Sequence, residues 1–191
     1  MGVYKVILQR RTIRRFAEER RIPLKILEKL VNAGRLAPSA ANLQPWDFVA
    51  VNDRELCDRI FPHLRWAGYI APEGDPPPGM RPAAYIVLVA NPAINRHWQH
   101  DFGAAAENIM LTAWEMGIGS CWLGSINRKQ IKEILSIPED REVDTVIALG
   151  YPREKSVVEE EKGSIKYWKD EKGVMHIPKR PLAKVMKVNG W

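Results

Sequence analysis

Cysteine is scarce in this chain of 191 residues: only Cys57 and Cys121 occur, and they lie far apart. Two cysteines exclude a disulfide framework and a four-cysteine zinc site, because each of these needs more thiols. Isolated cysteines are typical of a reducing compartment, in which thiols stay free. Cys121 stands next to Trp122 in an apolar segment, where we expect the thiol to behave as a small buried hydrophobe. For the indole of Trp122 we favour packing in the core, with contact to a bound ligand as the alternative.

Long apolar runs are also missing. No segment approaches the roughly 20 apolar residues that a membrane-spanning helix needs, and the first residues lack the apolar stretch of a signal peptide. We therefore expect a cytoplasmic protein that has no membrane partner.

Histidine occurs only four times. His97 and His100 are three residues apart, a spacing that lets two side chains on a helix share one metal, but the sequence offers no obvious third ligand. We predict no metal site and interpret both as residues at the start or on the surface of a helix.

Apolar and charged residues occur in ordinary globular proportions, 46% and 27%, so residues 1–191 are expected to form a single domain with its own core. The formal net charge is +6 and the isoelectric point is about 9.4. A positive surplus favours an anionic partner such as nucleic acid, acidic lipid or a phosphorylated cofactor. The basic residues concentrate near the two ends of the chain: Arg10, Arg11, Arg14, Arg15, Arg20, Arg21, Lys179, Arg180, Lys184 and Lys187.

Hydrophobic periodicity predicts a mixture of helices and strands. A short first helix is predicted to end near Gln9, and four further helices are predicted at 24–34, 54–64, 101–116 and 128–135. The predicted strands span 47–51, 85–90, 120–123 and 143–149. A hairpin is expected where 165–168 and 174–177 flank the turn 170–173, and the charged run 153–162 is interpreted as a solvated linker. Because helices and strands do not alternate strictly, the expected fold class is α+β.

Residues 66–82 are rich in proline and glycine. Proline lacks a backbone donor and fixes its own dihedral angle, so neither a helix nor a central strand is expected here. A long irregular loop within a compact domain is commonly a lid or a binding loop. Trp66 and Tyr69 are therefore candidates to contact the substrate, with packing of the loop onto the body as the alternative.

The segment Arg-Arg-Thr-Ile-Arg-Arg-Phe occupies residues 10–16. Guanidinium groups bind phosphate through paired, charge-assisted hydrogen bonds, so several arginines beside a hydroxyl make a suitable phosphate site. Composition alone leaves open the alternative of a solvated basic turn, because charge runs are commonly on the surface.

A second segment, Ala-Pro-Ser-Ala-Ala-Asn-Leu-Gln-Pro-Trp, occupies residues 37–46 between a predicted helix and a predicted strand. Its small residues would let the backbone approach a flat ligand, and Ser39, Asn42 and Gln44 offer hydrogen bonds to the polar edge of a heterocycle. Taken by itself, the segment is also consistent with an ordinary loop.

Together and at this spacing, "RRTIRRF" and "APSAANLQPWDF" resemble the N-terminal signature of the nitroreductase family of flavoenzymes. Three later stretches resemble that family too: residues 101–113 its central dimer-forming helix, "GIGSCWLGSIN" the stretch that faces the flavin ring, and "VIALGYP" the strand that follows. Residues 177–182, "IPKRPL", resemble its C-terminal motif. The resemblance covers nearly the whole chain, and the chain's length suggests a shorter branch.

The resemblance implies a nitroreductase-like fold, in which helices flank a central, mostly antiparallel sheet and two subunits form an intertwined homodimer. The tail 178–191 is expected to cross to the partner subunit, and the site is expected to lie at the dimer interface. The implied cofactors are FMN and NAD(P)H as electron donor.

The resemblance also implies roles for individual residues. Arg10, Arg11 and Thr12 would hold the FMN phosphate and ribityl chain, with Lys179 and Arg180 returning to the phosphate. Arg14 would lie at the pyrimidine edge, at N1 and O2, and Gly124 would offer its backbone N–H to flavin N5. The remaining residues would line the ring: Pro38, Ser39, Ala40, Asn42, Gln44, Leu123 and Ser125.

These roles imply a ping-pong transfer of two electrons from NAD(P)H to a small acceptor such as a nitroaromatic or a quinone. A fixed cation at Arg14 would stabilise the negative charge of the reduced flavin. Within the same fold, the alternatives are a flavin-dependent dehalogenase, a flavin-fragmenting enzyme or a non-catalytic flavin carrier. A basic nucleic-acid-binding module is the alternative from another class; no known binding motif supports it, and no nucleic-acid partner is expected.

Overall fold

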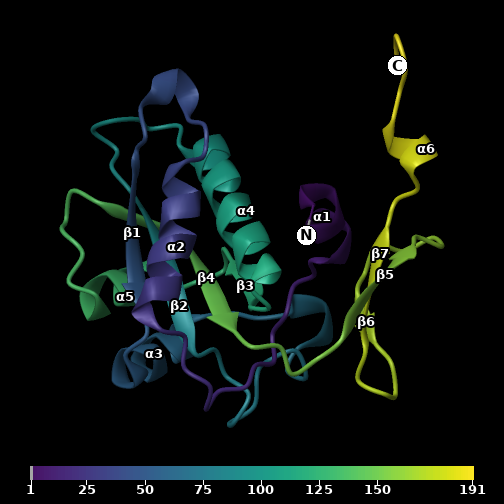
Figure 1. The fold of residues 1–191 in the computed structure, drawn as a ribbon, viewed down its shortest axis with the longest axis horizontal. Helices are drawn as coiled ribbons and strands as arrows, with labels where there is room; N and C mark the ends of the chain where they lie inside the picture. The colour runs from purple at the N-terminus through teal and green to yellow at the C-terminus, as the bar shows by residue number, and fades with distance from the viewer. Residues whose placement is uncertain (1) are drawn as a thin grey trace.

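The computed structural model of the chain describes residues 2–191 and has an antiparallel sheet at its centre (Figure 1). The strands lie in the order β1 (Trp46–Val51), β2 (Ala84–Ala90), β4 (Glu142–Gly150), β3 (Gly119–Leu123). Every neighbouring pair is antiparallel, which confirms the predicted fold class and sheet.

Helices cover both faces of this sheet (Figure 1). One face packs against α2 (Leu24–Arg35) and α4 (Gln99–Glu115). The other packs against α3 (Arg54–Ile60) and α5 (Arg128–Ile134), and three short 3₁₀ turns, η1 (Ala40–Asn42), η2 (Phe61–His63) and η3 (Gly68–Ile70), lie in the connections. No helix among residues 2–191 is long and apolar enough to cross a bilayer.

The buried strand β2 shows why its sequence is an uninterrupted apolar run. Successive side chains of a strand point to opposite faces of the sheet. Ile86 and Leu88 pack with the core beneath α2 and α4, whereas Tyr85 and Val87 pack with the core beneath α3 and α5. All seven residues of the strand are buried, so both periodic positions must be apolar.

The C-terminal part forms a second, small sheet beside the main body, on the side of α1 (Val3–Gln9) (Figure 1). Its strands lie in the order β5 (Ser156–Glu160), β7 (Met175–Lys179), β6 (Trp168–Lys169), and α6 (Leu182–Val185) follows. The expected hairpin is confirmed for β6 and β7 around the turn at Gly173, whose φ is +76°. Residues 165–167 lie outside the strand.

The interpretation of residues 153–162 as a linker is wrong for β5, which pairs in parallel with β7. The charged composition of the run suggested solvent exposure, and Val157 and Val158 are indeed exposed. Backbone pairing with a strand further along the chain nevertheless orders the segment, and this pairing leaves no local periodic signal.

Candidate functional site

The basic segment 10–16 lies against the edge of the central sheet. Thr12 forms a bridge with Ser120 of β3, and the Ile13 N–H donates to the Ser120 carbonyl at 2.9 Å. A Cβ added at Gly119 would lie 2.9 Å from Ile13, so glycine is what allows this close approach. The fold thus brings two of the sequence motifs, residues 10–14 and 120–125, together within one chain.

Arg10 and Arg11 carry two neighbouring positive charges at the end of α1. Arg10 forms an ion pair with Glu107 of α4 at 3.4 Å. Arg11 donates to backbone carbonyls, that of Leu8 at 2.5 Å and that of Arg10. Partial burial, and next the charge of Arg10, lower the pKa of Arg11. A guanidinium that meets neutral carbonyls beside another cation favours an anionic ligand.

Arg14 is held through both its backbone and its side chain. Its N–H donates to Oε1 of Glu154, which also accepts the N–H of Arg15 at 3.3 Å. Its guanidinium lies 5.1 Å from the centroid of the Tyr167 ring. Within residues 2–191, its buried Nη1 has no hydrogen-bond partner. A buried, unpaired guanidinium nitrogen is costly, so an acceptor oxygen from a bound group fits this position.

Cys121 lies next to this arginine and is only 2% exposed. Burial raises the pKa of its thiol to about 11, and the positive charge of Arg14 and a hydrogen bond from the Arg14 side chain oppose that shift. The thiol is therefore protonated at neutral pH, which confirms the expected role as a small hydrophobe and argues against a redox cysteine.

Trp122 is not in the core as expected: 43% of it is exposed. β3 is the edge strand of the sheet, so a side chain on its helix-covered face borders solvent. The indole Nε1 donates to Thr145 Oγ1 at 2.6 Å, and that hydroxyl donates to the Leu123 carbonyl at 2.7 Å. These bonds hold the end of β3 in place.

The turn that follows β3 has room for a ligand. Leu123 is buried, whereas Gly124 and Ser125 are exposed. Nothing lies within 4 Å of the Cβ position at Gly124, and its carbonyl accepts from Arg128 at 3.0 Å. An anchored backbone beside open space fits a flat group that approaches the main chain closely.

The segment before β1 is conformationally strained. Ala41, Asn42 and Gln44 have φ values of 49°, 56° and 51°, in the left-handed region that non-glycine residues rarely adopt. Pro38 and Asn42 are exposed. Strain of this kind persists only where surrounding contacts enforce it, and it gathers at binding sites.

Two hydrogen bonds shape this loop. The Ser39 hydroxyl accepts the N–H of Gln44 at 3.0 Å. The exposed Ala40 donates its N–H to Oδ1 of Asp101, on the first turn of α4, also at 3.0 Å. Asp101 is 6% exposed, and its Oδ2 has no partner within residues 2–191.

Within a single chain, the loop 38–44 lies far from the basic segment 10–16. The loop leads into β1 and the basic segment borders β3, and these are the two edge strands of the sheet. Three strand spacings of about 4.8 Å separate them by roughly 14 Å. Figure 1 shows the two segments well apart.

Lys179 is the last residue of β7, Arg180 follows it, and both are exposed. The Lys179 carbonyl accepts the N–H of Glu161 at 2.8 Å, and Arg180 donates to the Lys184 carbonyl at 3.3 Å. Within residues 2–191, neither side chain forms a hydrogen bond or an ion pair with Arg10. Their expected convergence on a phosphate stays a prediction.

Trp66 and Tyr69, the two expected substrate residues, differ in environment. Trp66 is partly buried against Phe61, with ring centroids 5.8 Å apart, and its buried Nε1 lacks a partner within residues 2–191. Tyr69 is 57% exposed. The Arg65 N–H donates to the Ser125 carbonyl at 3.0 Å, which places the start of this loop beside the turn at Gly124.

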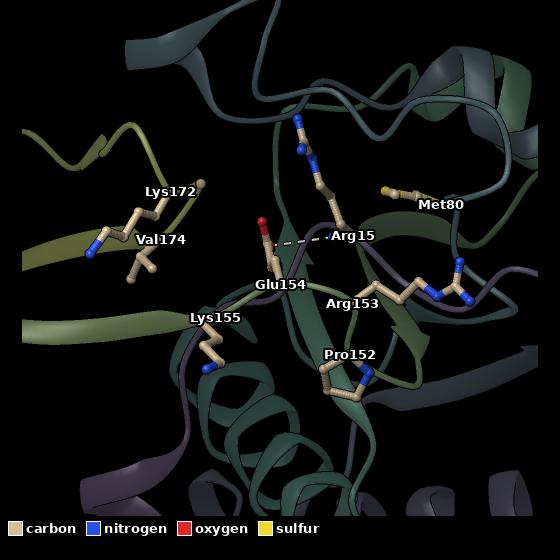
Figure 2. Close-up of a pocket in the computed structure, with 9 residues that line it drawn as sticks. Arg15, Met80, Pro152, Arg153, Glu154, Lys155, Lys172 and Val174 are labelled. Atoms are coloured by element: carbon tan, nitrogen blue, oxygen red, sulfur yellow. Dashed lines mark hydrogen bonds between the residues drawn. The ribbon is translucent and has the colours of Figure 1, made fainter.

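A cleft of about 610 Å³ lies where the main body meets the small sheet (Figure 2). Its cationic side chains do not converge: the ends of Arg15, Arg153, Lys155 and Lys172 point away from one another, and the Glu154 carboxylate lies between them. None of the expected site residues lines this cleft, so its position disagrees with the sequence motifs. The Arg14 side chain, with its unpaired Nη1, lies instead against Cys121 of β3, and the open turn at Gly124 follows the same strand. The cleft is lined by Arg15, Met80, Pro152, Arg153, Glu154, Lys155, Lys172, Gly173 and Val174.

Three residues of this region were not predicted from the sequence: Glu154, Asp101 and Tyr167. Each acts through a partner far along the chain, with separations of 140, 61 and 98 residues. An isolated acidic residue or tyrosine carries no local pattern, so only the "GYP" motif shortly before Glu154 pointed towards this part of the chain.

Comparison with known proteins agrees with the motifs. The model of the family described as "Nitroreductase family" matches residues 7–151. A protein of Archaeoglobus fulgidus, provisionally named NADH dehydrogenase/NAD(P)H nitroreductase, is 38% identical over 159 residues, which cover 79% of this chain and 86% of that protein. An iodotyrosine deiodinase of Haliscomenobacter hydrossis is 25% identical, with 81% of each chain covered.

Solved structures give the same result. An FMN-dependent nitroreductase from Clostridium difficile superposes with a TM-score of 0.70 at 26% identity, covering 97% of this chain and 98% of its own. A nitroreductase family protein from Clostridium novyi superposes with a TM-score of 0.69 at 30% identity, covering 80% and 88%. With its sequence motifs, its fold and a family match that spans most of its length, this chain belongs to the nitroreductase family.

Proposed function

We propose that this chain is an FMN-dependent NAD(P)H oxidoreductase that transfers two electrons to a small acceptor. The observation that carries the proposal is the buried Nη1 of Arg14, which has no partner within residues 2–191 and lies by the edge strand whose end opens at Gly124. An acceptor oxygen on the pyrimidine edge of a flavin would satisfy this nitrogen.

The neighbouring residues suit the other end of the cofactor. Arg10 and Arg11 bind the phosphate, and the Thr12 hydroxyl lies next to them on the same segment. Lys179 and Arg180 join them from the C-terminal arm. Within residues 2–191, Lys179 forms no ion pair, which leaves its charge available to an anion.

Bound FMN would supply the two-electron chemistry, accepting a hydride from the nicotinamide and passing the electrons on. Arg14 provides a positive charge that is fixed in place, and this charge favours the reduced, anionic cofactor. The backbone N–H of Gly124 orients the ring. These roles require no protein nucleophile.

The site is completed by a second copy of the chain. Because the loop 38–44 lies at the opposite edge of the sheet from the basic segment, Pro38, Ser39, Ala40, Asn42 and Gln44 reach the cofactor from the partner subunit. Leu123 and Ser125 contribute from the same subunit as Arg14. An isologous dimer then contains two equivalent sites.

Exposed apolar side chains support this assembly. On α1, Val3 and Tyr4 are 69% and 74% exposed, and Trp191 at the end of the tail is fully exposed. A concave surface of about 330 Å³ lies between α1, α2 and α4. Exposed apolar side chains that gather on α1 and on the tail are typical of an interface between chains, which supports a tail 178–191 that crosses to the partner. Its other exposed apolar residues are Leu182, Val185, Met186 and Val188.

The acceptor proposed is a nitroaromatic or a quinone. The similarity to a protein named iodotyrosine deiodinase favours a second candidate, reductive dehalogenation, with Trp66 and Tyr69 over the substrate. The two candidates are separated by measuring halide release from a halophenol against the reduction of a nitroaromatic.

The test is anaerobic reduction of the purified protein by NADH and by NADPH, followed by an acceptor panel. We expect a yellow protein whose flavin colour is lost on addition of NAD(P)H and returns on addition of a nitroaromatic. A protein that binds FMN, but whose FMN is not reduced by NAD(P)H, would instead be a carrier.

Arg10→Ala combined with Arg180→Ala should release FMN, and retention of FMN at unchanged affinity would refute the phosphate assignment. Arg21→Ala with Arg20→Ala is the matched control, because both arginines lie outside the proposed site.

A further inference from the structure

Two tyrosines that are far apart in sequence meet beside Arg14. Tyr69 belongs to η3, in the proline-rich loop, and Tyr167 precedes β6 of the small sheet. Their ring centroids are 4.9 Å apart with an interplanar angle of 50°. The backbone N–H of Tyr69 donates to the Tyr167 hydroxyl at 3.4 Å. The pair therefore joins the loop 66–82 to the C-terminal part of the chain.

Positive charge lies at both ends of this pair. The Arg14 guanidinium lies 5.1 Å from the Tyr167 ring centroid, and Lys166 Nζ lies 5.9 Å from that of Tyr69. Both distances are within the range of cation–π contact. Tyr69 is 57% exposed and Tyr167 is half-buried, so part of the surface of both rings is accessible to a ligand.

We propose that Tyr167 is a specificity-determining residue, and that it forms with Tyr69 an aromatic wall for planar acceptors that carry an anionic oxygen group. The proposal rests on the proposed function, because Arg14 is the residue that links the wall to the cofactor. The phenol rings stack on an electron-poor aromatic ring, and the charge of Lys166, beside Tyr69, selects for its negative group.

The competing explanation is structural: the tyrosines would only fasten the loop to the small sheet. Acceptor chemistry separates the two explanations. A fastening role affects every acceptor equally, whereas a wall matters for aromatic acceptors and is irrelevant to ferricyanide, which has no ring to stack.

The variants are Tyr167→Leu, which removes the ring, and Tyr167→Phe, which keeps it. Trp168→Leu is the matched control, because Trp168 is an exposed ring on the same small sheet that stacks on His176 instead. For each holoenzyme, the dissociation constant of 4-nitrobenzoate is measured by calorimetry. FMN content, the rate of flavin reduction by NAD(P)H, and kcat/KM for 4-nitrobenzoate and for ferricyanide are measured alongside.

Tyr167→Leu should weaken 4-nitrobenzoate binding about tenfold, the upper range for one aromatic pair, and raise KM by the same factor. FMN content and ferricyanide turnover should not change, and Tyr167→Phe and Trp168→Leu should resemble the wild type. Unchanged 4-nitrobenzoate affinity in Tyr167→Leu, or an equal loss of kcat/KM with 4-nitrobenzoate and with ferricyanide, would refute the proposed aromatic wall.

Failure of the proposed function has a different signature. A wild-type protein that holds no FMN would refute that function, while calorimetry with 4-nitrobenzoate would still decide whether the two rings form a binding wall.

Discussion

Asp101 accepts the backbone N–H of Ala40 at 3.0 Å, and this hydrogen bond joins the first turn of α4 to the strained loop before β1. The carboxylate is almost completely buried, and its second oxygen has no partner within residues 2–191. A rigid helix of 17 residues therefore holds in place a loop whose left-handed residues have little preference for their own conformation.

Replacing Asp101 should reveal how much this contact contributes. Asp101→Ala leaves the Ala40 N–H without its acceptor, which should lower the free energy of unfolding by about 1–3 kcal/mol. Asp101→Asn keeps a carbonyl oxygen at the same position and should lose less. Urea denaturation of both variants measures the difference, and equal losses would show that the hydrogen bond to Ala40 is unimportant.

Arg14 should control the reduction potential of the flavin. Arg14→Gln removes the positive charge that favours the reduced cofactor, so the potential should become more negative. Arg14→Lys retains a charge and should restore part of the loss. Redox titration of the holoenzyme measures both, with Arg21→Gln, on the exposed surface, as the control. A potential that is the same in Arg14→Gln and the wild type would remove Arg14 from the flavin edge.

Gly119 should tolerate no side chain. An added Cβ would lie 2.9 Å from Ile13, a buried residue that has no room to move aside, so Gly119→Ala should destabilise the fold by about 1–3 kcal/mol. Gly103→Ala is the control: its Cβ would meet Trp122 only at 4.0 Å, and alanine favours the helix. Thermal unfolding of the two variants should move in opposite directions, and a neutral Gly119→Ala would contradict the close approach of the basic segment.

The small sheet should respond to pH through His176. Its Nδ1 lies 3.0 Å from Glu159 of β5 and its Nε2 lies 3.4 Å from Asp170 of the following turn, while Lys162 is the cation acting on Glu159. The contact with Glu159, followed by that with Asp170, raises the pKa of His176. Its ring stacks on Trp168 with centroids 4.1 Å apart.

A raised folded-state pKa means that the stabilisation by the charged ring is complete below the unfolded value of about 6.5. It is lost as the pH rises through the higher folded value. Trp168 fluorescence followed against pH should report this loosening, and His176→Gln should abolish the transition. His97→Gln, at an exposed position, is the control. A transition that survives in His176→Gln would assign it to another group.

Sequence patterns predicted most of the main body because its elements are locally encoded. The apolar run of β2 and the alanine-rich stretch of α4 are recognisable from the sequence of each segment alone. The predicted ends of both elements lie within a few residues of those in the structure. The same holds for the two motifs at residues 10–16 and 37–46, whose letters identified the family before any contact was known.

The errors arise where a partner decides the outcome. β5 is charged and partly exposed, and only its pairing with β7 makes it a strand. Trp122 is a large apolar residue in a strand, a pattern that predicts burial, but the edge position of β3 leaves it partly in solvent.

Taken alone, the amino-acid sequence determined the family, the fold class and the residue types that suit a flavin phosphate, because these depend on local periodicity and on motif letters. Only the tertiary structure decided that Arg14 keeps an unpaired buried nitrogen, that Asp101 anchors the loop 38–44, and that Tyr69 meets Tyr167. The physical reason is that hydrogen-bond satisfaction and ring contacts are properties of pairs, and the chain brings these pairs together only when it folds.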